Sequence, residues 1–100
     1  KSLDNIGVVA RNLGEYEQGR KYHEESLAIK REIGDRAGEA TSLNNLGLVA
    51  RNLAEYEQAR KYHEESLEIR REISDRAGEA TSLNNLGAAA RNLGEYEQAR

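Results

Sequence analysis

The sequence predicts an all-α fold in which antiparallel helix pairs stack into a solenoid. The first observation is an internal repeat: the 100-residue chain matches itself at an offset of 40 residues, so that the segment starting at Ser2 returns at Ser42 and Ser82. The second is that apolar residues inside each unit recur at the spacing of a helix face. A sequence period between 20 and 50 residues is typical of solenoids, whose units bury apolar surface against their neighbours. The chain holds about two and a half units.

The first helix of each unit is predicted by a stripe of aliphatic and small side chains. In the middle unit, Leu43, Leu46, Ala50 and Leu53 follow one another at steps of three and four residues. This spacing places all four on one side of a helix. We expect this side to pack against the second helix of the unit.

A second stripe predicts the second helix of the unit. Its members in the middle unit are Ala59, Tyr62, Ser66, Ile69 and Ile73. They again share one side of a helix. The two stripes together indicate a helix pair in each complete unit.

Glycine marks the turn between the two helices of a unit. Gly14 and Gly94 stand in identical RNLGEYEQ segments, at the position where a helix end favours a positive φ. The middle unit has Ala54 here, which we expect to keep the left-handed conformation at a cost of about 1 kcal/mol. A tight turn is therefore predicted in every unit, including the stretch Leu93 to Glu95.

The junction between units carries a helix cap. Asp35 and Asp75 are suited to cap the N-terminus of the following helix. Gly34 suits the end of the preceding helix, whereas Ser74 does not. No linker or low-complexity segment interrupts the chain. The expected domain organisation is a single array over residues 1–100, with units at approximately 1–36, 37–76 and 77–100.

The composition argues against several classes of protein. The chain has 15 Lys and Arg against 18 Asp and Glu, with both signs interleaved, so it lacks the general attraction of a basic surface for nucleic acid or anionic membranes. It contains no Cys, which excludes disulfides and thiolate metal sites. No apolar stretch is long enough for a membrane span or a signal peptide. We expect a soluble, cytoplasmic protein.

The sequence lacks the residue patterns that catalysis or metal binding requires. His23 and His63 recur once per unit, without a second His or a Cys at ligand spacing, which favours a packing role for their rings. Ser26 and Ser66 lie where small residues suit helix contacts. We expect no enzymatic activity, no catalytic residue, no metal and no cofactor.

One pattern in the middle unit runs from L-x-x-L-G in the first helix to Glu-Tyr, Ala, His and Ser-Leu in the second. Its residues are Leu43, Leu46, Gly47, Glu55, Tyr56, Ala59, His63, Ser66 and Leu67. This pattern resembles the tetratricopeptide repeat, and it covers the full chain in register. The sequence departs from the family at Leu43, usually a large aromatic residue, and at Ala50, usually Tyr. It also lacks the usual Pro, and its period is 40 rather than 34 residues.

The longer unit, with LNNLG in the first helix and a GDRAGEA junction, is similar to the variant found in kinesin light chains, Pins-type adaptors and bacterial signalling proteins. This resemblance implies a right-handed solenoid whose first helices line a concave groove that grips extended peptide segments. It also implies a non-enzymatic scaffold for protein–protein contacts.

The opposite side of the first helix carries an unusual set of residues. In the middle unit these are Thr41, Asn44, Asn45, Leu48, Arg51 and Asn52. Asn is a mediocre helix former, and its amide offers a donor and an acceptor that match a peptide unit. We expect a ladder of Asn to hold the backbone of a protein or peptide partner, and one Arg per unit to bind acidic groups on it.

The neighbouring units repeat this face. The expected groove residues are Asn5, Val8, Arg11 and Asn12 in the first unit, and Asn84, Asn85, Ala88, Arg91 and Asn92 in the third. Asp4 takes the place of the leading Asn in the first unit and is expected to belong to the same ladder. Val8, Leu48 and Ala88 share one position and differ in size, with the smallest side chain in the third unit, which favours a role in size selectivity.

Other interpretations of the same residues stay open. The Asn side chains can instead form bonds between helices or cap them, and the Arg side chains can pair with neighbouring Glu. A structural function is the alternative to peptide binding: uncapped repeat faces can stack or exchange helices between copies of the chain. RNA binding by the Arg and Asn of each unit is disfavoured by the net charge of −3.

Overall fold

The computed structural model describes residues 2–99, and this part of the chain forms five helices. They are α1 (Leu3–Asn12), α2 (Tyr16–Ile33), α3 (Arg36–Asn52), α4 (Tyr56–Glu72) and α5 (Arg76–Ala99). No strand occurs among the described residues. The predicted all-α fold is confirmed.

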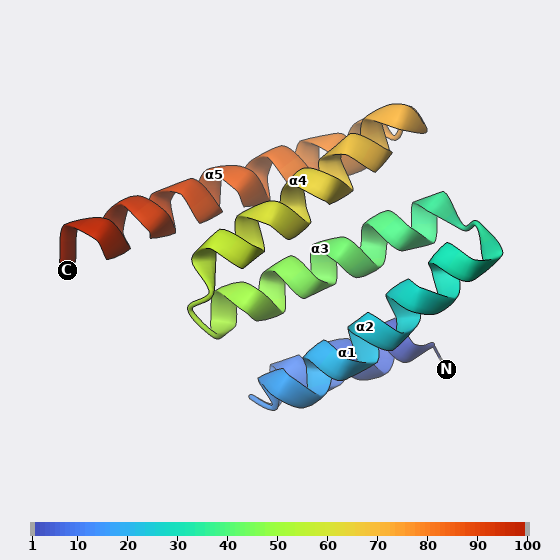
Figure 1. Ribbon diagram of the computed structural model, residues 1–100, viewed down its shortest axis with the longest axis horizontal. Coiled ribbons are helices and arrows are strands. Elements are labelled where there is room, and N and C mark those ends of the chain that lie inside the picture. The colour runs from blue at the N-terminus through green and yellow to red at the C-terminus, as the bar shows by residue number, and fades with distance from the viewer. Residues whose placement is uncertain (1, 100) are drawn as a thin grey trace.

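Each helix packs against the next one along the chain, which gives a row of antiparallel helices (Figure 1). α1 also contacts α3, so the first helices of successive units touch. The molecule measures 42 × 30 × 19 Å. The predicted solenoid of helix pairs, about two and a half repeats long, is therefore confirmed. Within residues 2–99, no helix is long and apolar enough to cross a membrane.

The core lies between α2, α3 and α4. Leu43 and Leu46 of α3 are each 1% exposed and pack with Leu27 of α2 and Ile69 of α4. Burying one such side chain stabilises the fold by about 1.5 to 3 kcal/mol. Most members of the two stripes of the middle unit are thus buried, whereas Leu53 and Tyr62 are half-buried. Ile73, the last member of the second stripe, is 37% exposed because it lies just past the end of α4.

The turn inside each of the first two units has the predicted left-handed residue. Gly14 has a φ of 82° and Ala54 a φ of 62°. In both turns the next backbone N–H closes the helix end, from Glu15 to the Ala10 carbonyl and from Glu55 to the Ala50 carbonyl, each at 2.8 Å. The expectation that Ala54 keeps the left-handed conformation is confirmed.

The junctions between units also follow the sequence, with one exception. Asp35 and Asp75 accept hydrogen bonds at 2.9 Å from the backbone N–H groups three residues later, so both predicted N-caps are confirmed. Gly34 is left-handed with a φ of 76°. Ser74, which was expected to be unsuited to this position, adopts the same conformation with a φ of 61°, because the Asp75 N–H bonds to the Arg70 carbonyl at 2.8 Å.

Glycine at the two strained positions is expected to stabilise the fold. Ala54→Gly and Ser74→Gly should each raise the free energy of unfolding by about 0.5 to 1 kcal/mol, because the cost of a left-handed side-chain residue exceeds the entropy that glycine adds to the unfolded chain. Gly14→Ala is the matched reverse change, since a Cβ there meets no atom within 4 Å. Urea unfolding measures all three, and a loss of stability in Ala54→Gly would contradict this account.

The turn predicted at Leu93 to Glu95 does not form, and α5 runs straight through it to Ala99. The segment around Gly94 is identical to that around Gly14, so local sequence does not explain the difference. After Gly14 the 18-residue α2 packs back on α1, whereas among the described residues no helix after Gly94 packs back on α5. Without such packing, a break in the backbone hydrogen bonds of α5 is not offset, so the helix continues.

Candidate functional site

The face predicted to bind a partner runs over α1, α3 and α5. The exposed residues of this face are Asn5, Val8, Asn12, Thr41, Arg51, Asn52, Asn84 and Arg91. The half-buried ones are Arg11, Asn44, Asn45, Leu48, Asn85, Ala88 and Asn92. Every predicted groove residue therefore reaches the surface.

Two side-chain hydrogen bonds join neighbouring units across this face. The Asn85 amide donates to the Asn44 Oδ1 at 2.7 Å, and the Arg11 Nε donates to the Asn52 Oδ1 at 2.5 Å. These bonds hold α5 against α3 and α3 against α1. Part of the polar face thus serves the array itself, as in the alternative in which Asn side chains bond between helices.

The bond between Asn44 and Asn85 leaves half of each amide for other partners. Asn85 uses a donor hydrogen and Asn44 its acceptor oxygen. The Asn44 amide N–H group and the Asn85 carbonyl oxygen form no other bond within the described chain. One donor and one acceptor side by side are what a peptide unit requires.

The arginines of this face differ from the other arginines of the molecule. Those elsewhere that pair with a carboxylate do so at 2.6 to 3.0 Å and are Arg20, Arg31, Arg36, Arg60, Arg71 and Arg76. On the predicted face, the Arg11 side chain bonds to an Asn, and within residues 2–99 the side chains of Arg51 and Arg91 have neither an ion pair nor a hydrogen bond. The alternative in which these Arg side chains pair with neighbouring Glu therefore does not apply to Arg51 and Arg91.

Asp4 does not belong to this face, and the expectation that it joins the Asn ladder is wrong. Its side chain is buried between α1, α2 and α3. One carboxylate oxygen lies 2.8 Å from the His23 Nδ1; the other accepts from the Lys30 ammonium at 2.7 Å and from Ser26 at 2.9 Å. Ser42 donates to it at 2.9 Å. The charged Asp4 side chain is therefore buried among hydrogen-bond donors, whereas the neutral side chain of Asn44 lies at the surface.

The surroundings of Asp4 keep it ionised. Burial by itself raises the pKa of this carboxyl, but the hydrogen bonds from His23, Lys30, Ser42 and Ser26 outweigh burial and hold the pKa well below its usual range. The carboxylate is thus a structural anion that ties three helices together.

The same cluster contains Ser, His and Asp, but in an arrangement that does not suit nucleophilic catalysis. The Ser26 hydroxyl donates to Asp4 and not to the imidazole. The His23 Nε2 is buried against Gly7 and has no hydrogen-bond partner in the described structure. A nucleophile needs its hydroxyl on the free imidazole nitrogen, so these residues form a packing cluster.

His63 takes the place of His23 in the second unit, without a carboxylate partner. Its Nδ1 is buried and has no hydrogen-bond partner in the part of the chain described. The pKa of His63 falls to about 4, first because burial disfavours the imidazolium and then because the charges of Arg70 and Arg51 repel it. The ring is neutral near pH 7 and packs on Gly47 of α3.

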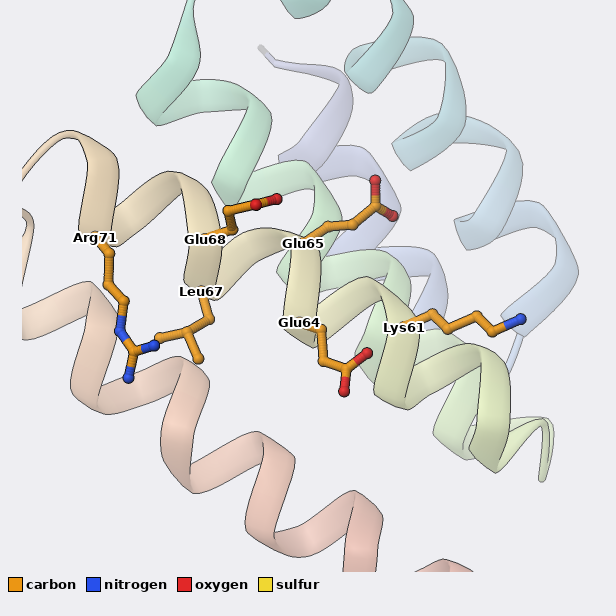
Figure 2. Close-up of a pocket in the computed structure, with 6 residues that line it drawn as sticks. All are labelled: Lys61, Glu64, Glu65, Leu67, Glu68 and Arg71. Carbon is orange, nitrogen blue, oxygen red and sulfur yellow. The ribbon is translucent and has the colours of Figure 1, made fainter.

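One hollow of the described surface lies outside the predicted face. It is open, has a volume of about 580 Å³, and is lined by Lys61, Glu64, Glu65, Leu67, Glu68 and Arg71. Figure 2 shows that all six side chains come from α4. Charges of both signs on one helix face are typical of a solvated surface, and the described residues hold no group of three His, Asp or Glu that could bind a metal. Sequence reasoning did not single out this hollow.

Comparison with known proteins decides the family. The Tetratricopeptide repeat family matches the chain over residues 1–72 and 39–100. The chain belongs to this family. The tetratricopeptide array is similar to the solved structure of BtubC (BKLC) from P. vanneervenii, with a TM-score of 0.86 and 25% sequence identity, over 97% of this chain and 41% of that one. No curated protein sequence matches it.

Membership of this family indicates the general role of the chain. Tetratricopeptide repeats mediate protein–protein interactions and are typically non-enzymatic scaffolds. Stacked repeats create extended concave surfaces that suit this role.

Proposed function

We propose that this tetratricopeptide array binds an extended, acidic segment of a protein partner along the face of α1, α3 and α5. The observation that carries the proposal is the pair of exposed arginines, Arg51 and Arg91, whose side chains have no ion pair or hydrogen bond in the described chain. A cation that the protein does not neutralise attracts and orients acidic groups of a partner.

Two amides of the same face supply contacts to the partner backbone. The Asn44 donor and the Asn85 acceptor lie together at the junction of two units. An extended segment presents its own N–H and C=O groups at regular intervals, so it can bond to this pair whatever its side chains are. The change from Leu48 to Ala88 gives room for a larger partner side chain at the third unit.

Removing the two charges is expected to weaken binding. Peptides selected from a random display library against the purified chain should be enriched in Asp and Glu. A double variant, Arg51→Gln with Arg91→Gln, should bind them about fivefold more weakly, because two exposed ion pairs together contribute about 1 kcal/mol. Raising the salt concentration should weaken binding to the native chain more than binding to the variant.

The control makes the same charge change on the other side of the molecule. Lys21→Gln with Lys61→Gln alters two exposed lysines on α2 and α4, one of which lines the hollow of Figure 2. We expect unchanged affinity for the selected peptides. Weaker binding by the control alone would assign the interaction to the α4 hollow and contradict the proposal.

A further inference from the structure

α5 carries an apolar face that repeats the inward face of α3. Leu83 corresponds to Leu43, yet Leu43 is 1% exposed in the core while Leu83 is 46% exposed. α3 is packed between α2 and α4, whereas α5 packs extensively on α4 and is joined to α3 by the bond between Asn44 and Asn85. We define the α5 face by the helical stripe Leu83, Leu86, Gly87, Ala90 and Leu93.

The two complete helix pairs show what this face is shaped to receive. In the first pair the His23 ring packs on Gly7, and in the second the His63 ring packs on Gly47; a Cβ on either glycine would lie 2.7 or 2.5 Å from a ring nitrogen. A Cβ on Gly87 meets no atom within 4 Å. The glycine that admits an imidazole ring is therefore repeated on α5 and solvent-exposed there.

Polar contacts of the second pair also have counterparts on α5. The Ser66 hydroxyl of α4 donates to the Ala40 carbonyl at 2.9 Å, and Glu72 of α4 pairs with Arg36 at 2.8 Å. Ala80 and Arg76 occupy the corresponding positions of α5, and both are exposed. The polar ends of the interface are thus repeated together with its apolar centre.

We propose that the α5 face binds an amphipathic helix of a partner protein with the chemistry of α4. The partner helix packs a flat ring, such as imidazole, over Gly87. Its serine, three residues after the ring, bonds to the Ala80 carbonyl, and a carboxylate near its C-terminus pairs with Arg76. This site is separate from the polar face of the proposed function.

A second copy of the chain is a less suitable occupant than a separate helix. The helices of the described chain that carry this pattern are α2 and α4. α4 is packed between α3 and α5, and α2 is tied to α1 through the bond between His23 and Asp4. Either helix would lose these contacts on moving to another copy, whereas a partner helix loses none of them.

A peptide with the sequence of residues 55–73 tests the site. Its Lys61 and Glu65 side chains, one helical turn apart and on the outer side of α4, are joined by an amide bridge because an isolated helix of this length is marginal in water. We expect saturable 1:1 binding to the full chain by calorimetry. Gly87→Leu should weaken it at least tenfold, and the matched variant Thr81→Leu, an exposed change on the side of α5 away from this stripe, should leave it within twofold.

Three results would overturn the proposal. The first is no saturable binding up to millimolar peptide, and the second is equal binding by Gly87→Leu, whose helix content circular dichroism verifies. The third is a sedimentation mass of the chain alone that rises with concentration and returns to the monomer in Gly87→Leu, because the occupant would then be a second copy. Failure here leaves the Arg51 and Arg91 experiment unaffected, since those variants act on the other face.

Discussion

Replacing Asp4 with alanine is expected to lower the free energy of unfolding by about 3 kcal/mol. The Asp4 carboxylate is buried and receives bonds from His23 and Lys30 of α2 and from Ser42 of α3. Removing it leaves these groups without their common acceptor, and burial denies water to His23 and Ser42. Urea unfolding at pH 7, followed by circular dichroism, measures the loss; a change below about 1 kcal/mol would show that the cluster contributes little.

A double variant built from the second unit serves as the control. That unit has Asn44 and Arg70 where the first has Asp4 and Lys30, and Arg70 donates to the Gly78 carbonyl at 3.0 Å. Asp4→Asn with Lys30→Arg reproduces this arrangement, in which the amide is neutral and the Arg side chain bonds to a backbone carbonyl. It should therefore be more stable than Asp4→Asn alone, and equal stability would argue against two interchangeable bonding schemes.

The contribution of Asp4 should also depend on pH in one direction. Its pKa is lowered in the folded protein, so the unfolded chain takes up the proton first as the pH falls. The stabilisation is complete above about pH 4, the ordinary pKa of an aspartate, and is lost in stronger acid. The deficit of Asp4→Ala should accordingly shrink below about pH 4.

The protein is expected to lose roughly 2 to 3 kcal/mol of stability through His63 alone as the pH falls from about 7.5 to about 4.5. The pKa of His63 is about 4 in the folded protein, against about 6.5 for an unfolded imidazole. Between these two pKa values His63 is protonated in the unfolded chain but not in the folded chain, so a lower pH favours unfolding.

His63→Phe isolates this effect, because it keeps a flat ring over Gly47 and removes the titrating group. As the pH falls, the free energy of unfolding should decrease more in the native chain than in the variant. Carboxylates that titrate in both proteins cancel in this comparison. A gap that stays constant from pH 7.5 to 4.5 would contradict a neutral, buried His63.

Much of the fold follows from the sequence because its determinants are local. The spacing of Leu43 and Leu46 fixes a helix face, and Asp35 and Asp75 can bond only to the N–H groups that follow them. The course of α5 could not be derived in this way. Gly94 has the same neighbours as Gly14, and what differs is the helix that packs beyond the turn.

The candidate site was less predictable, since duplication places different chemistry at equivalent positions. Asp4 matches Asn44 in sequence position but is buried. A signal existed in the sequence: the first unit pairs an acidic Asp4 with Lys30, whereas the second pairs a neutral Asn44 with Arg70. The hydrogen bond between Asn44 and Asn85 depends on how two units pack, which no single helix reveals.

The most direct test of the proposed function is to locate the bound peptide. Isotope-labelled chain would be titrated with a selected acidic peptide while the backbone amide shifts are followed by NMR. The proposal predicts that the perturbed amides lie along α1, α3 and α5, with the strongest shifts near Asn45, Leu48 and Arg51. Shifts concentrated on α4 between Lys61 and Arg71, with the α3 amides unmoved, would contradict it.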